Sequence, residues 1–275
     1  MPAHTLISDA LMDPLTSEND HRKNTKPIIE IYKANKVFHT PTGDFHALKE
    51  ITTNIYPGEF LSVVGKSGSG KSTLVNMLTG IDHPTSGNIC IDDIPIHQMS
   101  ESDMSIWRGK NLGIIFQFFQ LLPMLSLIEN VMIPMDFVNR YPTSERPKRA
   151  AALIERLGLS DVADELPGAV SGGQQQTAAI ARALANDPPI LIADEPTGNL
   201  DSQTADKIFK IFRELSREGK TIVMVTHDPL IAQLTDRILM LYDGELIPPK
   251  TPLFEQLIQL TISLNKTGQQ SQSET

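Results

Sequence analysis

The fold is decided by the stretch Gly65-Lys66-Ser67-Gly68-Ser69-Gly70-Lys71-Ser72. It matches the pattern G-x-x-x-x-G-K-[ST], in which glycines let the backbone curl until successive N–H groups point inward at phosphate oxygens. An apolar run, Phe60–Val64, precedes the loop, and a helical run, Thr73–Leu78, follows it. The N-terminus of that helix adds a dipole that favours an anion. The sequence therefore predicts a strand, a phosphate-binding loop and a helix in direct succession.

The residue types within this loop indicate a site for a nucleoside triphosphate, which we expect to be ATP. Lys71 is expected to reach the β- and γ-phosphates, and the Ser72 hydroxyl is expected to ligate Mg²⁺. Thr73 follows directly and is counted with the nucleotide-binding residues. The alternative is a glycine-rich turn without a ligand. The strand before the loop and the helix after it favour the phosphate site.

Short β-rich runs alternate with helical stretches along the rest of the chain. Three runs, Leu61–Val64, Ile190–Ala193 and Thr221–Val225, are almost entirely apolar. Strands that helices cover on both faces have this composition, so the pattern predicts an α/β fold with a largely parallel sheet. The expected strands are Ile28–Tyr32, Phe60–Val64, Asn88–Ile91, Gly113–Phe116, Ile190–Ala193, Thr221–Val225 and Arg237–Tyr242.

The chain divides into three parts. Residues 1–27 are polar, and we expect a flexible arm there. Residues 28–248 form the main domain, with a helical insert at about 118–170 in which Ala151, Leu153, Ile154 and Leu157 recur at helical spacing. Residues 249–275 carry a helical apolar face and end in a polar run that we expect to be disordered; the face comprises Leu253, Leu257, Ile258 and Leu264.

Composition narrows the range of partners. The formal net charge of −9 argues against general nucleic-acid binding, which needs clustered Lys and Arg. Cys90 is the single cysteine, so an intrachain disulfide is excluded. The start of the chain lacks a basic region followed by an apolar run, and no stretch reaches the roughly 18 apolar residues that span a bilayer. We expect a protein that is soluble or is held at a membrane by a partner.

A carboxylate pair, Asp194-Glu195, directly follows an apolar strand. The carboxyl ends of parallel strands form the ligand crevice of such sheets. Asp194 is therefore expected to hold the Mg²⁺ shell, and Glu195 to polarise the attacking water, a role worth roughly 10²- to 10⁴-fold in rate. The alternative is a solvated acidic turn; the phosphate loop favours the catalytic interpretation.

The segment Val170-Ser171-Gly172-Gly173-Gln174 resembles the Leu-Ser-Gly-Gly-Gln signature of ABC ATPases. The resemblance covers about residues 28–248. It implies a P-loop NTPase core of RecA type, an N-terminal antiparallel β subdomain and an inserted α-helical subdomain. Phe116-Gln117, Glu129-Asn130-Val131 and the run from Asp194 to Asp201 look most like the branch with lipoprotein-releasing, macrolide-export, peptide-resistance and cell-division ATPases.

The same resemblance assigns further site residues. Gln117 looks like the Q-loop glutamine, which contacts Mg²⁺ and transmits movement of the helical insert. Asp201 closes a segment that looks like the D-loop, and His227 looks like the switch histidine. Phe38 occupies the position of an aromatic residue that stacks on adenine. The plainer alternatives are a solvated loop histidine for His227 and a core side chain for Phe38.

The signature implies that the site is shared between two chains. Ser171-Gly172-Gly173 opens the helical stretch Gln174–Leu184, which is a second anion-binding geometry. The resemblance implies a homodimer packed head to tail, in which Ser171, Gly172, Gly173 and Gln174 of one subunit cap the γ-phosphate held by the other. Hydrolysis removes that contact, so ATP favours the closed dimer only until it is cleaved.

Two departures from the family pattern accompany the signature. Val170 replaces the usual leucine, and Thr177 replaces an arginine, a change that we expect to weaken dimer contacts or local packing. An apolar cluster after Gln117 has two open interpretations, the insert's own core or a groove for a helix of a membrane partner; it comprises Phe118, Phe119, Leu121, Leu122 and Leu125.

The resemblance implies an ATP-hydrolysing subunit that powers a transporter, in the direction of export or extrusion. It would lie on the cytoplasmic face of the membrane, bound to an integral membrane permease. The alternative is a nucleotide-gated signalling or scaffold ATPase that transports nothing, like the cell-division relative. A soluble ABC ATPase of DNA repair or translation fits less well, because a long coiled-coil insertion and a second ATPase half are absent from the sequence.

Overall fold

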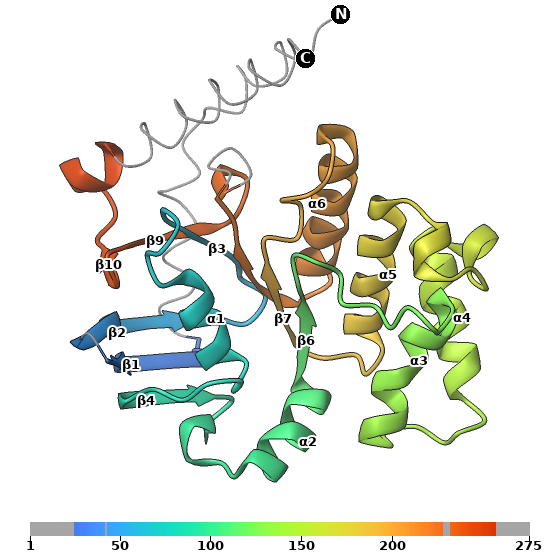
Figure 1. The fold of residues 1–275 in the computed structure, drawn as a ribbon, viewed down its shortest axis with the longest axis horizontal. Helices are drawn as coiled ribbons and strands as arrows, with labels where there is room; N and C mark the ends of the chain where they lie inside the picture. The colour runs from blue at the N-terminus through green and yellow to red at the C-terminus, as the bar shows by residue number, and fades with distance from the viewer. Residues whose placement is uncertain (1–24, 42, 228–231, 257–275) are drawn as a thin grey trace, which may run out of the picture.

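The computed structural model describes residues 25–41, 43–227 and 232–256, which build two β-sheets and a group of helices (Figure 1). The strands are β1 (Ile29–Thr40), β2 (Gly43–Ile55), β3 (Phe60–Val64), β4 (Ser86–Ile91), β5 (Ile94–Pro95), β6 (Leu112–Ile115), β7 (Ile190–Asp194), β8 (Thr221–Val225), β9 (Arg237–Tyr242) and β10 (Glu245–Ile247). The α-helices are α1 (Lys71–Leu78), α2 (Glu101–Asn111), α3 (Leu127–Val138), α4 (Arg146–Arg156), α5 (Gly172–Leu184) and α6 (Ser202–Arg217).

The larger sheet has the strand order β10-β9-β3-β8-β7-β6, and all neighbours are parallel except β10 and β9. Alternate residues of its central strands enter two separate cores. Ile190 and Ile192 face α1, whereas Leu191 and Ala193 face α5 and α6. This double coverage explains why the strands are apolar at nearly every position. The prediction of a parallel α/β sheet is confirmed.

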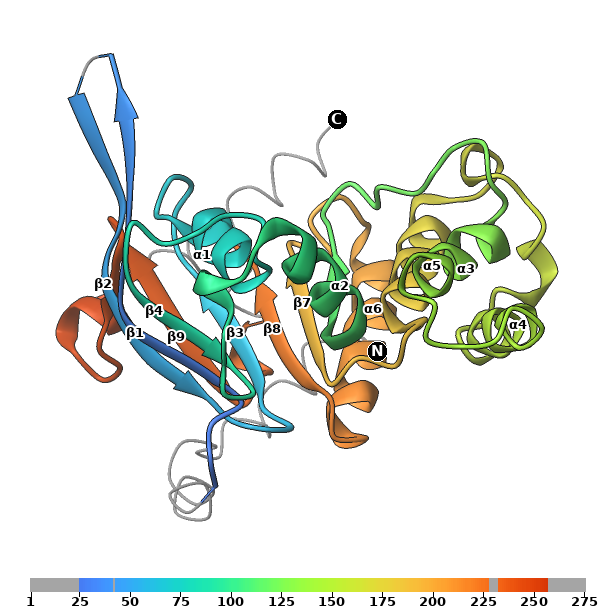
Figure 2. The same cartoon turned by 90° about the horizontal axis from the view of Figure 1, so that it is seen from below.

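The smaller sheet, β2-β1-β4-β5, is antiparallel and packs on the opposite side of α1 from the parallel sheet. Strand β1 extends further than the expected Ile28–Tyr32, and β2 was not predicted at all. Register shifts interrupt the β1–β2 pairing between Ile31 and Val37, and they break the alternation that would identify a strand. The outer half of this hairpin projects well away from the body of the molecule (Figure 2).

Helices α3, α4 and α5 pack on one another to form a third core beside the parallel sheet (Figure 1). Ser126 caps α3 through a reciprocal capping box with Glu129, which fixes where this helix begins. Of the residues expected at helical spacing, Ile154 is buried and Ala151 is exposed.

Parts of two predicted segments, at the two ends of the sequence, cannot be compared with these elements. Most of the expected N-terminal arm, and Leu257, Ile258 and Leu264 of the expected C-terminal face, lie outside the described residues. In the described ranges, no helix combines the length and the apolar character that crossing a bilayer requires.

Candidate functional site

The phosphate loop lies between the carboxyl end of β3 and the first turn of α1. Gly68 and Gly70 have φ values of 78° and 104°, a backbone region that residues with a side chain rarely adopt. At Gly65, an added Cβ would lie 2.2 Å from the carbonyl oxygen of Leu241. At Gly70, it would lie 2.5 Å from the carbonyl oxygen of Ala47. The glycines are therefore needed both for the curl of the loop and for its close approach to two neighbouring strands.

Lys71 points back across the loop that precedes it. Its Nζ donates hydrogen bonds to the carbonyl oxygens of Gly65 at 2.8 Å and Lys66 at 3.0 Å. Burial lowers the pKa of this ammonium, whereas the nearby carboxylates of Glu195 and Asp194 act to raise it. An anion bound in the loop would offset the cost of keeping a buried charge, so the geometry suits a phosphate.

The interior of the loop has unused bonding capacity. The Ser69 hydroxyl is buried and has no hydrogen-bond partner among the described residues. Lys66, Ser67 and Gly68 are exposed at the rim, as is Ser72 at the start of α1, while Thr73 is half-buried. A buried polar atom without a partner is costly unless a ligand or water reaches it, which fits an oxygen-rich ligand here.

Asp194 ends β7 and faces the phosphate loop. Its pKa is raised, first by burial and then by the neighbouring Glu195, while Lys71 and a hydrogen bond from the Ser72 side chain act in the opposite direction. A divalent cation would favour the ionised form. The structure therefore brings together Ser72 and Asp194, two of the three expected protein ligands of such a cation.

Glu195 follows at once with φ 48°, so the chain turns sharply where β7 ends. Its backbone N–H donates to the carbonyl oxygen of Val225 on β8 at 2.9 Å. Its Oε2 lies 3.2 Å from Nδ1 of His227, and the Glu195 side chain is 21% exposed. The carboxylate is thus held at the strand ends beside His227 and with partial access to solvent, as a water-activating group requires.

The side chains of Gln117 and Glu195 both lie beside Gly198. A Cβ added at Gly198 would lie 3.4 Å from Nε2 of Gln117 and 3.5 Å from Oε2 of Glu195. The predicted residues Gln117, Asp194, Glu195 and His227 therefore come together at the carboxyl ends of β6, β7 and β8, beside the phosphate loop.

The ligand set fits Mg²⁺. The Ser72 hydroxyl, the Asp194 carboxylate and the Gln117 side-chain oxygen are hard oxygen ligands. Among the described residues, no group of three or more His, Cys, Asp or Glu side chains could hold a metal by itself. Mg²⁺ is commonly held by one or two protein groups together with substrate phosphates and water, so this sparse set is the expected one.

The signature segment starts α5 and bonds within its own helix. Ser171 is the N-cap; its Oγ accepts from the backbone of Gln174 at 3.3 Å, and the Gln174 Oε1 accepts from the Ser171 N–H at 2.9 Å. Gly173 packs so closely on α6 that an added Cβ would lie 2.5 Å from Cγ2 of Thr204. In the described part of the chain, no hydrogen bond connects Ser171 to the phosphate loop. The structure does not bring these two predicted halves of the site together.

The departures from the signature pattern are accommodated locally. The Thr177 hydroxyl donates to the carbonyl oxygen of Gly173, one turn earlier in α5, at 2.8 Å. Val170 is half-buried and packs against the core of the helical part. The expected weakening of dimer contacts by Thr177 stays a prediction.

Asp201 caps α6, because its Oδ1 accepts from the backbone of Gln203 and Thr204, both at 3.1 Å. These bonds, led by one from the Thr204 hydroxyl, lower the pKa of the carboxyl. Since Gly173 also packs on Thr204, the cap and the signature meet at one side chain.

Phe38 lies near the tip of the projecting hairpin and is 39% exposed. It is directly opposite Phe45, which is 55% exposed. The alternative that Phe38 is a core residue is therefore wrong, and its ring is accessible to a ligand.

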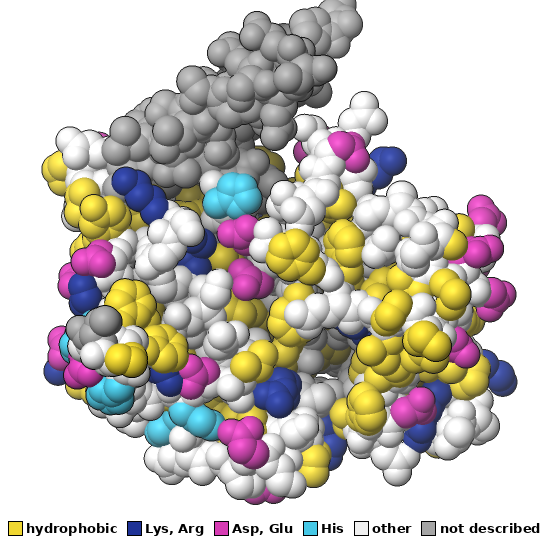
Figure 3. All heavy atoms as spheres, viewed as in Figure 1, with side chains coloured by type: hydrophobic (Ala, Val, Ile, Leu, Met, Phe, Trp, Pro, Cys, Tyr) yellow, Lys and Arg dark blue, Asp and Glu magenta, His cyan; other side chains and the backbone are white. Residues whose placement is uncertain are grey.

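The apolar cluster after Gln117 is divided. Leu121 packs into the core of the helical part, while Phe118 and Leu122 are 71% and 48% exposed. The adjacent Met124 is 86% exposed. Hydrophobic side chains gather over the helical part on the face shown in Figure 3.

Two residues to which the sequence analysis assigned no role in the site hold this loop in place. Asn130 is fully buried; its Oδ1 accepts from the Leu122 N–H at 2.7 Å, and its Nδ2 donates to the Leu125 carbonyl at 3.0 Å. Arg182 of α5 donates to the carbonyl oxygens of Gln120 and, at 2.7 Å, Phe119. Only their contacts in the folded chain reveal these roles.

A P-loop NTPase is defined by a phosphate loop, by carboxylates at a strand end and by a parallel sheet, all of which this chain has. Comparison with known proteins makes the class specific, because the family model described as ABC transporter matches residues 48–198. Rv0986 of Mycobacterium tuberculosis, an uncharacterized ABC transporter ATP-binding protein, is 41% identical over 82% of this chain and 91% of that protein. The chain belongs to the ABC transporter family and is one of its ATP-binding, ATP-hydrolysing subunits.

Two further relatives add detail. The macrolide export ATP-binding/permease protein MacB of Mannheimia succiniciproducens is 43% identical over 80% of this chain but only 34% of that protein. The ATP-binding cassette MJ0796 of Methanocaldococcus jannaschii has a dimeric, post-hydrolysis structure with ADP and phosphate. That structure matches with a TM-score of 0.75 and 41% identity, over 80% of this chain and 97% of that one.

Proposed function

We propose that this chain hydrolyses ATP in the interface of a homodimer and that the cycle of closing and opening drives export or extrusion by a membrane permease. The observation that carries the proposal is the separation of the two phosphate-binding ends. Lys71 and the phosphate loop lie with the carboxylates, while the Ser171 helix start bonds within itself. A second copy, packed head to tail, would supply the missing half of each site. The dimeric cassette with 41% identity supports this arrangement.

Within each site, the residues have distinct roles. The phosphate loop, from Gly65 to Thr73, binds the phosphates, and Phe38 stacks on the base. Ser72, Gln117 and Asp194 would hold Mg²⁺, which neutralises phosphate charge. Glu195 accepts a proton from the attacking water, and His227, 3.2 Å away, orients the carboxylate. Ser171 to Gln174 of the other copy and Asp201 complete the interface.

The Glu195→Gln variant tests the chemistry. We expect turnover to fall by roughly 10²- to 10⁴-fold because the general base is lost. ATP binding should persist, so the variant should accumulate as an ATP-dependent dimer. Phosphate release measures turnover, and size-exclusion chromatography with and without ATP measures assembly. Glu214→Gln, on the exposed side of α6, is the matched control. Normal hydrolysis by Glu195→Gln would refute the base assignment.

The permease is expected to dock on the exposed residues Phe118 and Leu122, next to Gln117, on the cytoplasmic face of the membrane. The fusion of ATP-binding and permease functions in the name of MacB supports such a partner. This contact would couple the membrane partner to Gln117, whose side chain lies beside Gly198, as does that of Glu195. The residues before 28 and after 248 are proposed to lie outside this ATPase domain.

The double variant Phe118→Asp/Leu122→Asp tests the docking surface. Copurification of the membrane partner from native membranes should be lost, because two carboxylates would have to be buried in an apolar contact. ATP binding to the isolated chain should not change. Phe137→Asp is the matched control, since Phe137 is 84% exposed but lies at the other end of α3. Retained copurification would place the partner elsewhere. Substrate movement in vesicles then distinguishes transport from a signalling role.

A further inference from the structure

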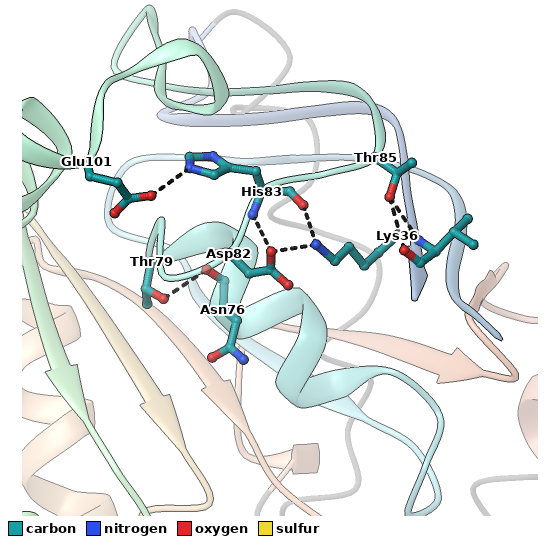
Figure 4. Close-up of polar contacts among 8 residues, drawn as sticks. Lys36, Asn76, Thr79, Asp82, His83, Thr85 and Glu101 are labelled. Atoms are coloured by element: carbon teal, nitrogen blue, oxygen red, sulfur yellow. Dashed lines mark hydrogen bonds and ion pairs between the residues drawn. The ribbon is translucent and has the colours of Figure 1, made fainter. Parts of the chain in front are cut away.

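Lys36 connects the projecting hairpin to the phosphate-loop helix. Its side chain is only 13% exposed, although it belongs to the outer half of β1. The Nζ donates to Oδ1 of Asp82 at 2.5 Å and to the carbonyl oxygen of His83 at 2.9 Å (Figure 4). The same Nζ lies 5.0 Å from the centroid of the Phe38 ring, within the cation–π range.

The acceptor of this bond is itself fixed to α1. The backbone N–H of Asp82 donates to the carbonyl oxygen of Asn76 at 3.0 Å, and the N–H of Ile81 donates to the same oxygen at 2.9 Å. Asn76 belongs to α1, whose first residue is Lys71 of the phosphate loop. Asp82 therefore has a fixed position relative to α1 and the phosphate loop.

The hairpin needs such a connection. Pairing of β1 with β4 ends at Asn35 and Ser86, so beyond this point β1 pairs with β2 alone. The Val37 N–H donates to Oγ1 of Thr85 at 3.0 Å, and Lys36 supplies the neighbouring contacts to Asp82 and His83 (Figure 4). Isolated two-stranded hairpins are marginally stable in water, so these bonds set the position of the tip.

We propose that Lys36 is a positioning residue for base recognition: its ammonium covers one face of the Phe38 ring and leaves the other face to stack on the nucleotide base. This inference rests on the proposed nucleotide role of Phe38. Phenylalanine has no hydroxyl, so a hydrogen bond cannot orient its ring; the ammonium does so instead. Because Asp82 holds Lys36, the base subsite stays at a fixed distance from the phosphate subsite.

The test compares a ligand that has a base with one that lacks it. Binding of ADP and of inorganic tripolyphosphate is measured by calorimetry, in EDTA, for the full chain and for Lys36→Met. We expect ADP affinity to fall about two- to fivefold, the range of a cation–π contact at a partly exposed site. Tripolyphosphate affinity should not change. Lys33→Met is the matched control, because its ammonium lies 5.8 Å from the Tyr32 ring on the same strand.

The same substitution in a Phe38→Leu background distinguishes an effect through the Phe38 ring from a stabilisation of the hairpin that does not involve the ring. If Lys36 acts through the ring, Lys36→Met has no further effect there. An equal loss in both backgrounds, an equal loss for tripolyphosphate, or no loss of ADP affinity would overturn the inference. Lys36→Gln repeats the measurement if Lys36→Met does not melt cooperatively. If Phe38→Leu alone leaves ADP affinity unchanged, the assignment of Phe38 fails and the inference fails with it.

Discussion

Individual side chains in this site are held in unfavourable charge states that a ligand would relieve. Lys71 is a buried cation whose pKa is lowered, and Asp194 is a half-buried carboxyl whose pKa is raised. Burial is the main cause in both cases, and each shift means that the folded protein disfavours the ionised form. Phosphate and a divalent cation are the ligands that would reverse both effects, so the site is less stable without them.

Replacing Asp194 exposes this cost. Because the pKa of Asp194 is higher in the folded than in the unfolded chain, its carboxylate destabilises the fold at pH values above both. The cost disappears as the pH falls through the folded value. We therefore expect Asp194→Asn to melt at a higher temperature than the parent protein at pH 7.5, without nucleotide and in EDTA. The gain should shrink towards pH 4.

Thermal denaturation followed by circular dichroism at several pH values measures this difference. Asp206→Asn, at an exposed position of α6, is the matched control and should leave the melting temperature unchanged at each pH. A lower melting temperature for Asp194→Asn at pH 7.5 would contradict the prediction.

At the scale of elements, the signature helix and α6 are packed against each other at a glycine. An added Cβ at Gly173 would lie 2.5 Å from Cγ2 of Thr204, whereas at Gly172 the nearest atoms would be 3.7 Å away. Both glycines lie in the first turn of α5, so the backbone tolerates alanine at either position. The two sites differ only in their neighbours, which makes them a natural comparison.

We expect Gly173→Ala to lower the free energy of unfolding by about 1–3 kcal/mol through overpacking. Gly172→Ala should be neutral or stabilising by up to about 1 kcal/mol, since alanine favours the helix. Thr204→Ser removes the methyl group that clashes and should restore most of the loss in a double variant. Urea denaturation measures all three. If Gly173→Ala and Gly172→Ala behave alike, helix packing does not require this glycine.

The elements that could be predicted are those whose pattern is local. The run Phe60–Val64 is buried at every position, and the glycines after it restrict the backbone, so β3, the phosphate loop and α1 followed from neighbouring residues alone. Strand β2 was missed because Lys49 and Glu50 interrupt its apolar alternation. The roles of Asn130 and Arg182 were missed because their partners are carbonyl and N–H groups, which every residue has.

At the scale of the molecule, the described chain contains every predicted part of the site but holds the signature apart from the phosphate loop. Two variants, each inactive because of a different substitution, should therefore restore activity when they are mixed. Lys71→Ala disables one phosphate loop and Ser171→Arg disables one signature, so each variant alone should lose ATPase activity. In a mixture, a heterodimer contains one complete site, formed by the intact loop of one chain and the intact signature of the other.

We expect the mixture to recover activity that neither variant shows, and the recovery to increase with total protein concentration. Phosphate release over a range of mixing ratios measures it, with a maximum near equal amounts. Lys71→Ala mixed with a second phosphate-loop variant, Ser72→Ala, is the control, because no complete loop exists in that pair. Equal activity in the two mixtures would contradict a shared site.

The turn between β9 and β10 has a consequence for the folding of the nascent chain on the ribosome. The Gly244 N–H donates to the carbonyl oxygen of Ser69 at 3.1 Å, and the Gly244 carbonyl accepts from Lys49 at 2.8 Å. The phosphate loop is translated early, yet its supports include residues near the other end of the sequence. A partly synthesised chain on the ribosome would thus carry the loop without the strand on which it rests. Nucleotide binding would begin only after residue 244 has left the exit tunnel, so capture of ATP would mark the completion of the fold.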